Sequence, residues 1–129
     1  MKIIMKTKIL YFGNPYLKED NLAVLVCRKL KKELNIDFEE VKDTFQLIGK
    51  NQDNSIIIDV VQGIKKVQII DSETLQRGNI TSLHDFDLSF FLSLLKLKPR
   101  ILGIPQNYNE EKAIEETRCL IPTLLSGNE

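Results

Sequence analysis

Three side chains that could together bind a divalent cation are spread along the sequence: Asp20, Asp59 and His84, the chain's one histidine. Two carboxylates and an imidazole offer oxygen and nitrogen donors that suit nickel, zinc and related first-row ions, and they leave coordination positions open for water or a substrate. Such a site exists only if the fold gathers three distant segments. The elements that carry these residues therefore decide whether this chemistry is available.

Each of the three residues also has a simpler structural interpretation. Asp20 could cap the helix that begins near Leu22, because aspartate is a common N-cap residue. Asp59 interrupts an apolar strand, where its carboxylate could satisfy a neighbouring helix or loop. His84 could be an ordinary residue in the first turn of a helix. Taken one at a time, the residues leave these alternatives open.

Alternating apolar and amphipathic runs indicate the class of fold. Strands are predicted at 8–12, 37–41, 55–61, 66–70 and 100–104, and helices at 21–34, 83–97 and 110–125, with a less defined helix at 44–48. The run SIIIDVV at 55–61 is typical of a parallel strand buried on both faces. After the turn Gln62-Gly63, the strand at 66–70 is expected to form a hairpin with it. Ser82 is expected to cap the second helix, and Pro122 to bend or end the third.

This order predicts a three-layer α/β/α sandwich whose mostly parallel sheet has about five strands, one of them antiparallel. In such sheets, ligands bind beyond the carboxyl ends of the strands. Asp20 follows the first strand, Asp59 lies near the end of the central one, and His84 lies at the start of the helix after the hairpin. All three therefore fall at the kind of position where a site forms.

The composition is that of a single soluble domain spanning 1–129, and it argues against several classes of partner. Lys plus Arg and Asp plus Glu both number 18, so no net charge attracts nucleic acid or an anionic membrane. No apolar run approaches the ~20 residues of a membrane span. Lys6 and Lys8 interrupt the apolar start and no cleavage site follows, so a cytoplasmic protein is expected.

Familiar catalytic and nucleotide motifs are missing from the sequence. The turn GNPYLKEDN at 13–21 has Glu19 and Asp20 where a nucleotide-binding turn would have glycines, and carboxylates repel phosphate. There is no GxGxxG, GxxxxGK[ST], GxSxG or HExxH motif. Cys27 and Cys119 lack the spacing of a metal site and are both expected to be buried thiols on helices, which argues against a cysteine nucleophile.

In the order and spacing of four segments, the sequence resembles the hydrogenase maturation endopeptidases, which trim the large subunit of nickel–iron hydrogenases. The segments are GNPYLKED after an apolar strand, then IIIDVV, then TSLHDFDLSFFLSLLKL, then RILGIPQN. The similarity runs from Lys8 to Leu125. It implies that the family's metal-binding trio falls on Asp20, Asp59 and His84, and that Asn14 is the family's turn asparagine.

The resemblance further implies an endopeptidase that removes a C-terminal tail from a nickel-loaded large-subunit precursor. The nickel, carried by the substrate, would dock on the trio, with zinc able to take its place. The sequence departs from the family pattern at Tyr11, where a glycine is common, and in the shortened loop 43–49. Two alternatives follow: a non-catalytic or divergent module that binds a metal or metalloprotein during assembly, and a flavodoxin-like domain for a small ligand.

Overall fold

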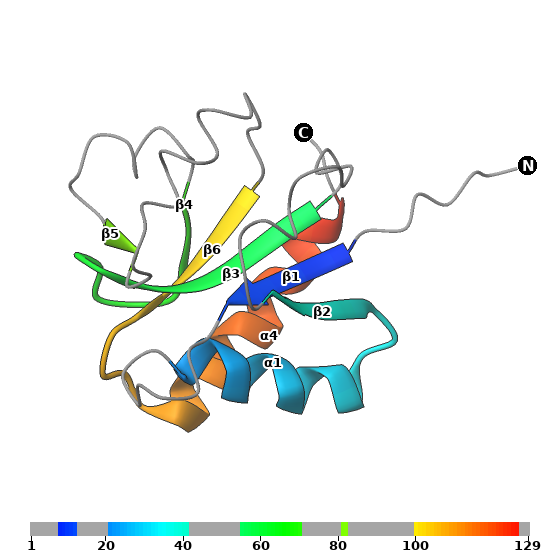
Figure 1. The fold of residues 1–129 in the computed structure, drawn as a ribbon, viewed down its shortest axis with the longest axis horizontal. Coiled ribbons are helices and arrows are strands. Elements are labelled where there is room, and N and C mark those ends of the chain that lie inside the picture. The colour runs from blue at the N-terminus through cyan, green and yellow to red at the C-terminus, as the bar shows by residue number, and fades with distance from the viewer. Residues whose placement is uncertain (1–7, 13–20, 42–54, 71–80, 83–99, 127–129) are drawn as a thin grey trace, which may run out of the picture.

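A mixed β-sheet with two helices packed beneath it forms the described part of the chain, which in this computed structural model comprises residues 8–12, 21–41, 55–70, 81–82 and 100–126 (Figure 1). The elements in chain order are β1 (Lys8–Phe12), α1 (Leu22–Glu33), β2 (Asp37–Val41), β3 (Ser55–Gln62), β4 (Gln68–Ile70), β5 (Thr81–Ser82), β6 (Arg100–Pro105) and α4 (Glu110–Ser126). Strands β1 and β2 have the predicted bounds, and the other predicted elements within the described residues differ by a few residues.

The strand order is β2-β1-β3-β6-β4, with β5 paired to the far end of β3. The pairs β1–β2, β1–β3 and β3–β6 are parallel, whereas β4–β6 and β3–β5 are antiparallel. Parallel strands need crossover connections, and α1 supplies one between β1 and β2. The prediction of an α/β fold with a mostly parallel mixed sheet is therefore confirmed.

The predicted hairpin between β3 and the strand at 66–70 is wrong. Strand β3 is bonded to β1 on one side and to β6 on the other, so β4 pairs with the outer side of β6 instead. Val67 is not part of the ladder, because its N–H donates to the Glu116 carboxylate of α4 at 3.1 Å. Close succession in sequence favoured a hairpin, but the edges of the central strand were already occupied.

Gly103 of β6 lets β4 pack closely against the centre of the sheet. A Cβ atom at this position would meet the Ile70 Cδ1 atom, and it would lie 3.1 Å from Val61 Cγ2 and 3.3 Å from Ile64 Cδ1. These three side chains come from β4, the end of β3 and the turn between them. These three side chains thus fill the space that a side chain at position 103 would occupy.

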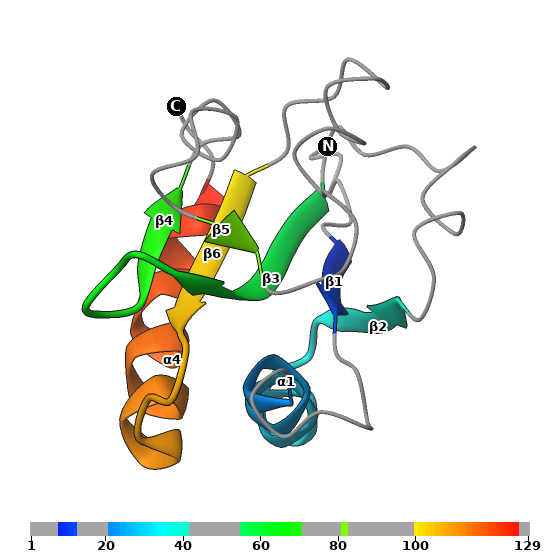
Figure 2. The same cartoon turned by 60° about the vertical axis from the view of Figure 1, so that its left-hand side comes forward.

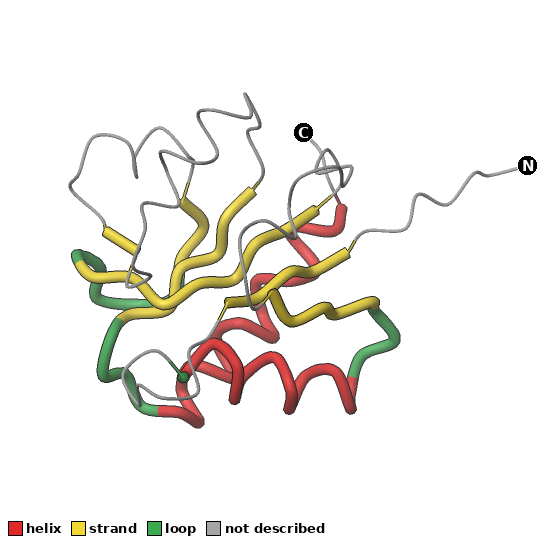
Figure 3. The backbone as a smooth tube through the Cα atoms, in the orientation of Figure 1, coloured by secondary structure: helices red, strands yellow, loops and turns green. Residues whose placement is uncertain are grey.

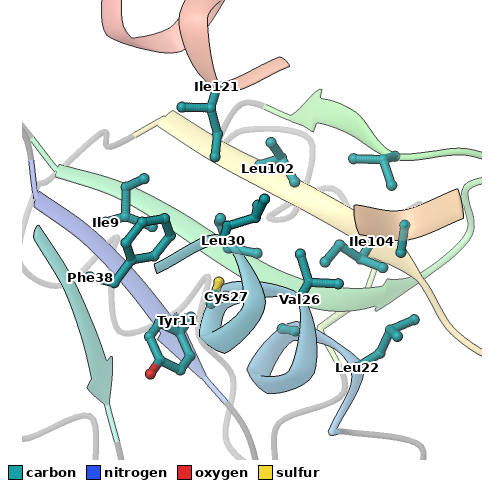
Figure 4. Packing of buried hydrophobic residues seen from close by; sticks show 14 of the residues in the cluster. Ile9, Tyr11, Leu22, Val26, Cys27, Leu30, Phe38, Leu102, Ile104 and Ile121 are labelled. Carbon is teal, nitrogen blue, oxygen red and sulfur yellow. The ribbon is translucent and has the colours of Figure 1, made fainter. Parts of the chain in front are cut away.

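Helices α1 and α4 lie on the same face of the sheet, as Figures 1, 2 and 3 all show. Their apolar sides meet alternate residues of β1, β3 and β6 in one core cluster, in which Leu30 and Cys27 of α1 contact the sheet (Figure 4). Helix α4 continues through Pro122 to Ser126, so the alternative that it ends near this proline is wrong. In the described part of the chain, neither helix is both long and apolar enough to cross a membrane.

The opposite face of the sheet is also buried. The residues of this second cluster are Leu10, Val41, Ile57, Val61, Ile70 and Ile101, with Ile64 packed against them. The helix predicted at 83–97, which would make the third layer, lies outside the described residues, as does the uncertain helix at 44–48. Two-sided burial of β3 nevertheless agrees with its sequence, which is β-branched on both sides of Asp59.

Because the space beside Gly103 is filled, we expect Gly103→Ala to lower the free energy of unfolding by about 1–3 kcal/mol. Ile70→Val removes the atom nearest the new methyl group and should by itself cost about 0.5–1.5 kcal/mol. The double variant should be more stable than the sum of the two single changes predicts, which urea unfolding measures. Additive losses would show that the two side chains do not compete for this space.

Candidate functional site

Asp59 is fully buried within the central strand of the sheet, with 0% of its surface exposed. Its neighbours Ile58 and Val60 point into the cluster beneath the sheet, where α1 and α4 lie. Since side chains alternate along a strand, the carboxylate of Asp59 projects from the other face, the face of Ile57 and Val61. A carboxylate at such a position is costly to bury unless it is bound by polar groups or a cation.

The strands that pair with β3 change at the position of Asp59. Pairing with β1 ends at Ile58, opposite Tyr11, whereas pairing with β6 continues through Asp59, opposite Gly103. Strand β3 runs on to Gln62, one residue beyond the predicted end, so Asp59 lies three residues before its last residue. By the same register, Asp59 lies level with Phe12, the last residue of β1, and therefore at the carboxyl end of that strand.

Polar groups that sequence reasoning did not single out lie beyond Asp59 at the same edge. The Gln62 amide donates to the Gln106 side-chain oxygen at 2.8 Å, and the Gln106 N–H donates to the Val61 carbonyl at 3.0 Å. Asn107 follows with a φ of 60°, a left-handed conformation that asparagine tolerates better than most residues. The dipeptide Gln106-Asn107 after a strand is the only signal that could have indicated this end of the sheet.

The other two predicted site residues, Asp20 and His84, lie outside the described residues. Their described neighbours are Asn21, at the N-cap position of α1, and Ser82, the last residue of β5. Asn21 makes no side-chain cap hydrogen bond, and the alternative that Asp20 caps α1 falls outside the described residues. Across the described segments of the chain, no group of three or more His, Cys, Asp or Glu side chains could hold a metal ion. The trio therefore stays a prediction.

Tyr11, at a position where the resemblance leads one to expect glycine, points away from the face of Asp59. Its ring is buried in the cluster beneath the sheet, near Cys27 (Figure 4). Burial, and then the charge of Glu40, raise the pKa of the Tyr11 hydroxyl, which also bonds Arg28. The bulk of Tyr11 therefore lies on the helical side of the sheet.

The two cysteines have different environments, contrary to the prediction that both are buried. Cys27 is buried in α1, and burial raises the pKa of its thiol well above the ordinary value, so it is a poor nucleophile. Cys119 is exposed. The buried positions of α4 are Ala113, Thr117, Ile121 and Leu124. Their spacing of about one helical turn puts Cys119 on the opposite side of the helix.

Comparison with solved structures identifies the fold. The crystal structure of the NiFe hydrogenase maturation protease HycI from Thermococcus kodakarensis KOD1 matches with a TM-score of 0.61 and 19% identity, over 95% of this chain and 93% of that one. The crystal structure of the Hydrogenase 3 maturation protease matches with a TM-score of 0.63 and 17% identity, over 89% and 88%. The chain has the fold of the hydrogenase maturation proteases.

The resemblance found in the sequence is thus confirmed at the level of the fold, over nearly the whole chain. No protein-family model matches the sequence, and none of the curated proteins is a significant match to it. At such low identity the likeness does not by itself carry over an activity or a metal site.

The contrast between the cysteines gives a direct test of the core. In the native protein at pH 8, iodoacetamide should modify Cys119 and leave Cys27 unmodified, because the buried thiol is both inaccessible and protonated. Peptide mass mapping measures this, and urea-unfolded protein is the control in which both should react. Equal labelling of the two cysteines under native conditions would contradict the packing of α1 against the sheet.

Proposed function

We propose that this protein is an endopeptidase that removes the C-terminal tail of a nickel-loaded hydrogenase large-subunit precursor in the cytoplasm. The fold likeness to two maturation proteases supports the class of reaction. The observation that carries the proposal is the fully buried carboxylate of Asp59 on the central strand, at the level where β1 ends. An ordinary structural strand would have an apolar residue there.

The pairing of β5 supports an approach of His84 to Asp59. The register pairs Gln62 with Thr81 and Val61 with Ser82. Ser82, two residues before His84 in the sequence, therefore lies beside β3 two residues from Asp59.

Chain connectivity also supports the choice of Asp20. Strand β1 ends at Phe12, beyond the Tyr11–Ile58 pair, and α1 begins at Leu22. Leu22 packs in the same cluster as Val60 and Ile104, in the carboxyl halves of β3 and β6. Asp20 precedes Leu22 by two residues, and consecutive Cα atoms are only ~3.8 Å apart. This short separation supports Asp20 as a member of the proposed trio.

The proposed trio fits nickel as part of the substrate. Asp20 and Asp59 would serve as anionic ligands and His84 as a neutral one, a donor set that suits nickel or zinc. The second imidazole nitrogen of His84 needs a partner, for which Asp85 is the neighbouring carboxylate in sequence. Docking the substrate's metal would hold the adjacent peptide bond in place, and such positioning can supply ~7 kcal/mol or more of the barrier.

We expect Asp59→Asn and His84→Ala each to abolish tail removal from nickel-loaded precursor, because each removes one donor from the docking site. Intact-mass spectrometry of the precursor measures the loss of the tail. Asp37→Asn is the matched control, since Asp37 is exposed on the edge strand β2 and makes only a 3.9 Å ion pair with Lys8. It should process precursor at the parent rate.

Circular dichroism and nickel titration separate the possible causes of a loss. A folded His84→Ala variant that still trims precursor at the parent rate would contradict the assignment. If the parent protein binds nickel and the precursor but never removes the tail, the non-catalytic assembly module is the correct function instead. If the parent binds no nickel at all, the small-ligand alternative is favoured.

A further inference from the structure

The side of Asp59 that faces β6 is closed by apolar side chains. Asp59 is paired with Gly103 of β6, so a side chain at position 103 would stand beside the carboxylate on the same face of the sheet. Glycine has no side chain, and the space is occupied instead by Val61, Ile64 and Ile70. We refer to these three residues as the apolar wall.

The apolar wall is tightly packed and shielded from water. The Val61 Cγ2 and Ile64 Cδ1 atoms lie 3.1 and 3.3 Å from the position of a Cβ atom at residue 103, and the Ile70 Cδ1 atom is nearer still. Val61 is 0% and Ile70 3% exposed, and Ile64 packs against the same cluster. Contacts this close leave no space for a water molecule between the wall and Gly103.

Two features fix the turn 63–67, which joins β3 to β4 and supplies Ile64 (Figure 3). Gly63 has a φ of 105°, a conformation that other residues rarely adopt. At the far end of the turn, the Val67 N–H donates to the Glu116 carboxylate at 3.1 Å. The wall is therefore held by the backbone at one end of the turn and by α4 at the other, as a rigid support for a site requires.

The chain ends that precede the two other members of the proposed trio lie on the opposite edge of β3. Strand β6 is paired with Val61, so β5, whose Ser82 is also paired with Val61, runs along the edge that β1 uses. On this edge β1 ends at Phe12, level with Asp59. The ends of β1 and β5 thus approach each other beside Asp59, on the side away from the apolar wall.

Core packing alone does not explain this arrangement. A purely structural pair of buried strands would have β-branched side chains on both partners. Here a carboxylate faces a glycine, a residue that weakens a strand and often marks a close approach of other groups. The attraction between a carboxylate and a cation is stronger in apolar surroundings than in water, and the apolar shell of a metal site controls how much solvent reaches it.

We propose that the apolar wall positions Asp59 for its ligand. It keeps water from the β6 side of the carboxylate, so that a divalent cation can approach only from the β1 side. This rests on the proposed function for the identity of the cation, which is the nickel of the precursor. Val61, Ile64 and Ile70 are positioning residues, because they act through Asp59 and do not contact the cation.

The test removes only the outer methyl groups of the wall. Ile64→Val/Ile70→Val deletes the two Cδ1 atoms that cover Gly103 and leaves a space of about one water molecule. With water admitted beside Asp59, the affinity of the full chain for Ni²⁺ should fall ~tenfold, as isothermal titration calorimetry measures. Adding Gly103→Ala returns a methyl group to the vacated space and should restore most of the affinity.

Ile9→Val/Ile121→Val is the matched control, because it removes the same two groups from the cluster beneath the sheet. It should lower the free energy of unfolding by an amount similar to that of the wall variant. Its affinity for Ni²⁺ should stay within about twofold of the parent, because neither residue lies on the face of Asp59.

A second measurement needs no nickel. If the wall keeps water from Asp59, the charge at this position is less well hydrated in the parent than in the wall variant. Asp59→Asn should therefore raise the urea midpoint of unfolding more, or lower it less, in the parent than in Ile64→Val/Ile70→Val. In the Ile9→Val/Ile121→Val background, the effect of Asp59→Asn should match its effect in the parent.

The two measurements separate this proposal from the proposed function. The wall proposal is overturned if the wall variant binds Ni²⁺ like the parent, if the control loses as much affinity, or if the urea midpoints show no coupling between the wall and Asp59. If the parent binds no Ni²⁺, the proposed function loses its docking site, and the urea midpoints alone decide the wall proposal: coupling supports it, and additive effects overturn it.

Discussion

The burial of β3 on both faces and along both edges is the constraint on which the rest of the structure depends. Its apolar residues enter two separate clusters, and its backbone is bonded to β1 and β6. A strand in this position has little contact with water, so the carboxylate of Asp59 cannot rely on solvent for stabilisation. Charge at this point must be balanced by polar groups or a cation, and this makes the carboxyl edge beside β1 the natural place for a site.

The two faces of the sheet have different roles. Beneath the sheet, α1 and α4 close a continuous apolar cluster, and even the polar end of Tyr11 is directed outwards to Arg28. This side provides stability and holds the α1 N-terminus at the carboxyl edge. The other face includes Asp59 together with the close approach of Ile70 to Gly103. The ring of Tyr11 therefore adds to the cluster beneath the sheet, on the side away from the carboxylate of Asp59.

Much of this arrangement could be predicted from the sequence, because the relevant signals are local. The run SIIIDVV is typical of a strand buried on both sides, and the apolar spacing of α1 indicates which side faces the sheet. Which strand β4 pairs with was not predictable in the same way. The sequence of β4 fits an antiparallel strand beside either β3 or β6, and only the occupied edges of β3 decide between them.

Other differences have equally specific causes. Cys119 was expected inside because free cysteine is commonly buried, yet the buried spacing of α4 passes through Thr117 and Ile121 instead. For the site, the sequence placed Asp59 correctly on the central strand. The meeting of Asp20 and His84 with it depends on segments beyond the described residues, where register and connectivity supply the only guidance.

The most direct measurement is a crystal structure of the full chain soaked with Ni²⁺, with anomalous data collected at the nickel absorption edge. We predict one strong anomalous peak at the carboxyl edge of β1 and β3. A carboxylate oxygen of Asp20, a carboxylate oxygen of Asp59 and a ring nitrogen of His84 should each lie ~2.0–2.2 Å from this peak, as for comparable divalent ions. A map in which these three side chains lie apart, or in which nickel binds elsewhere and Asp59 is held by unrelated protein groups, would contradict it.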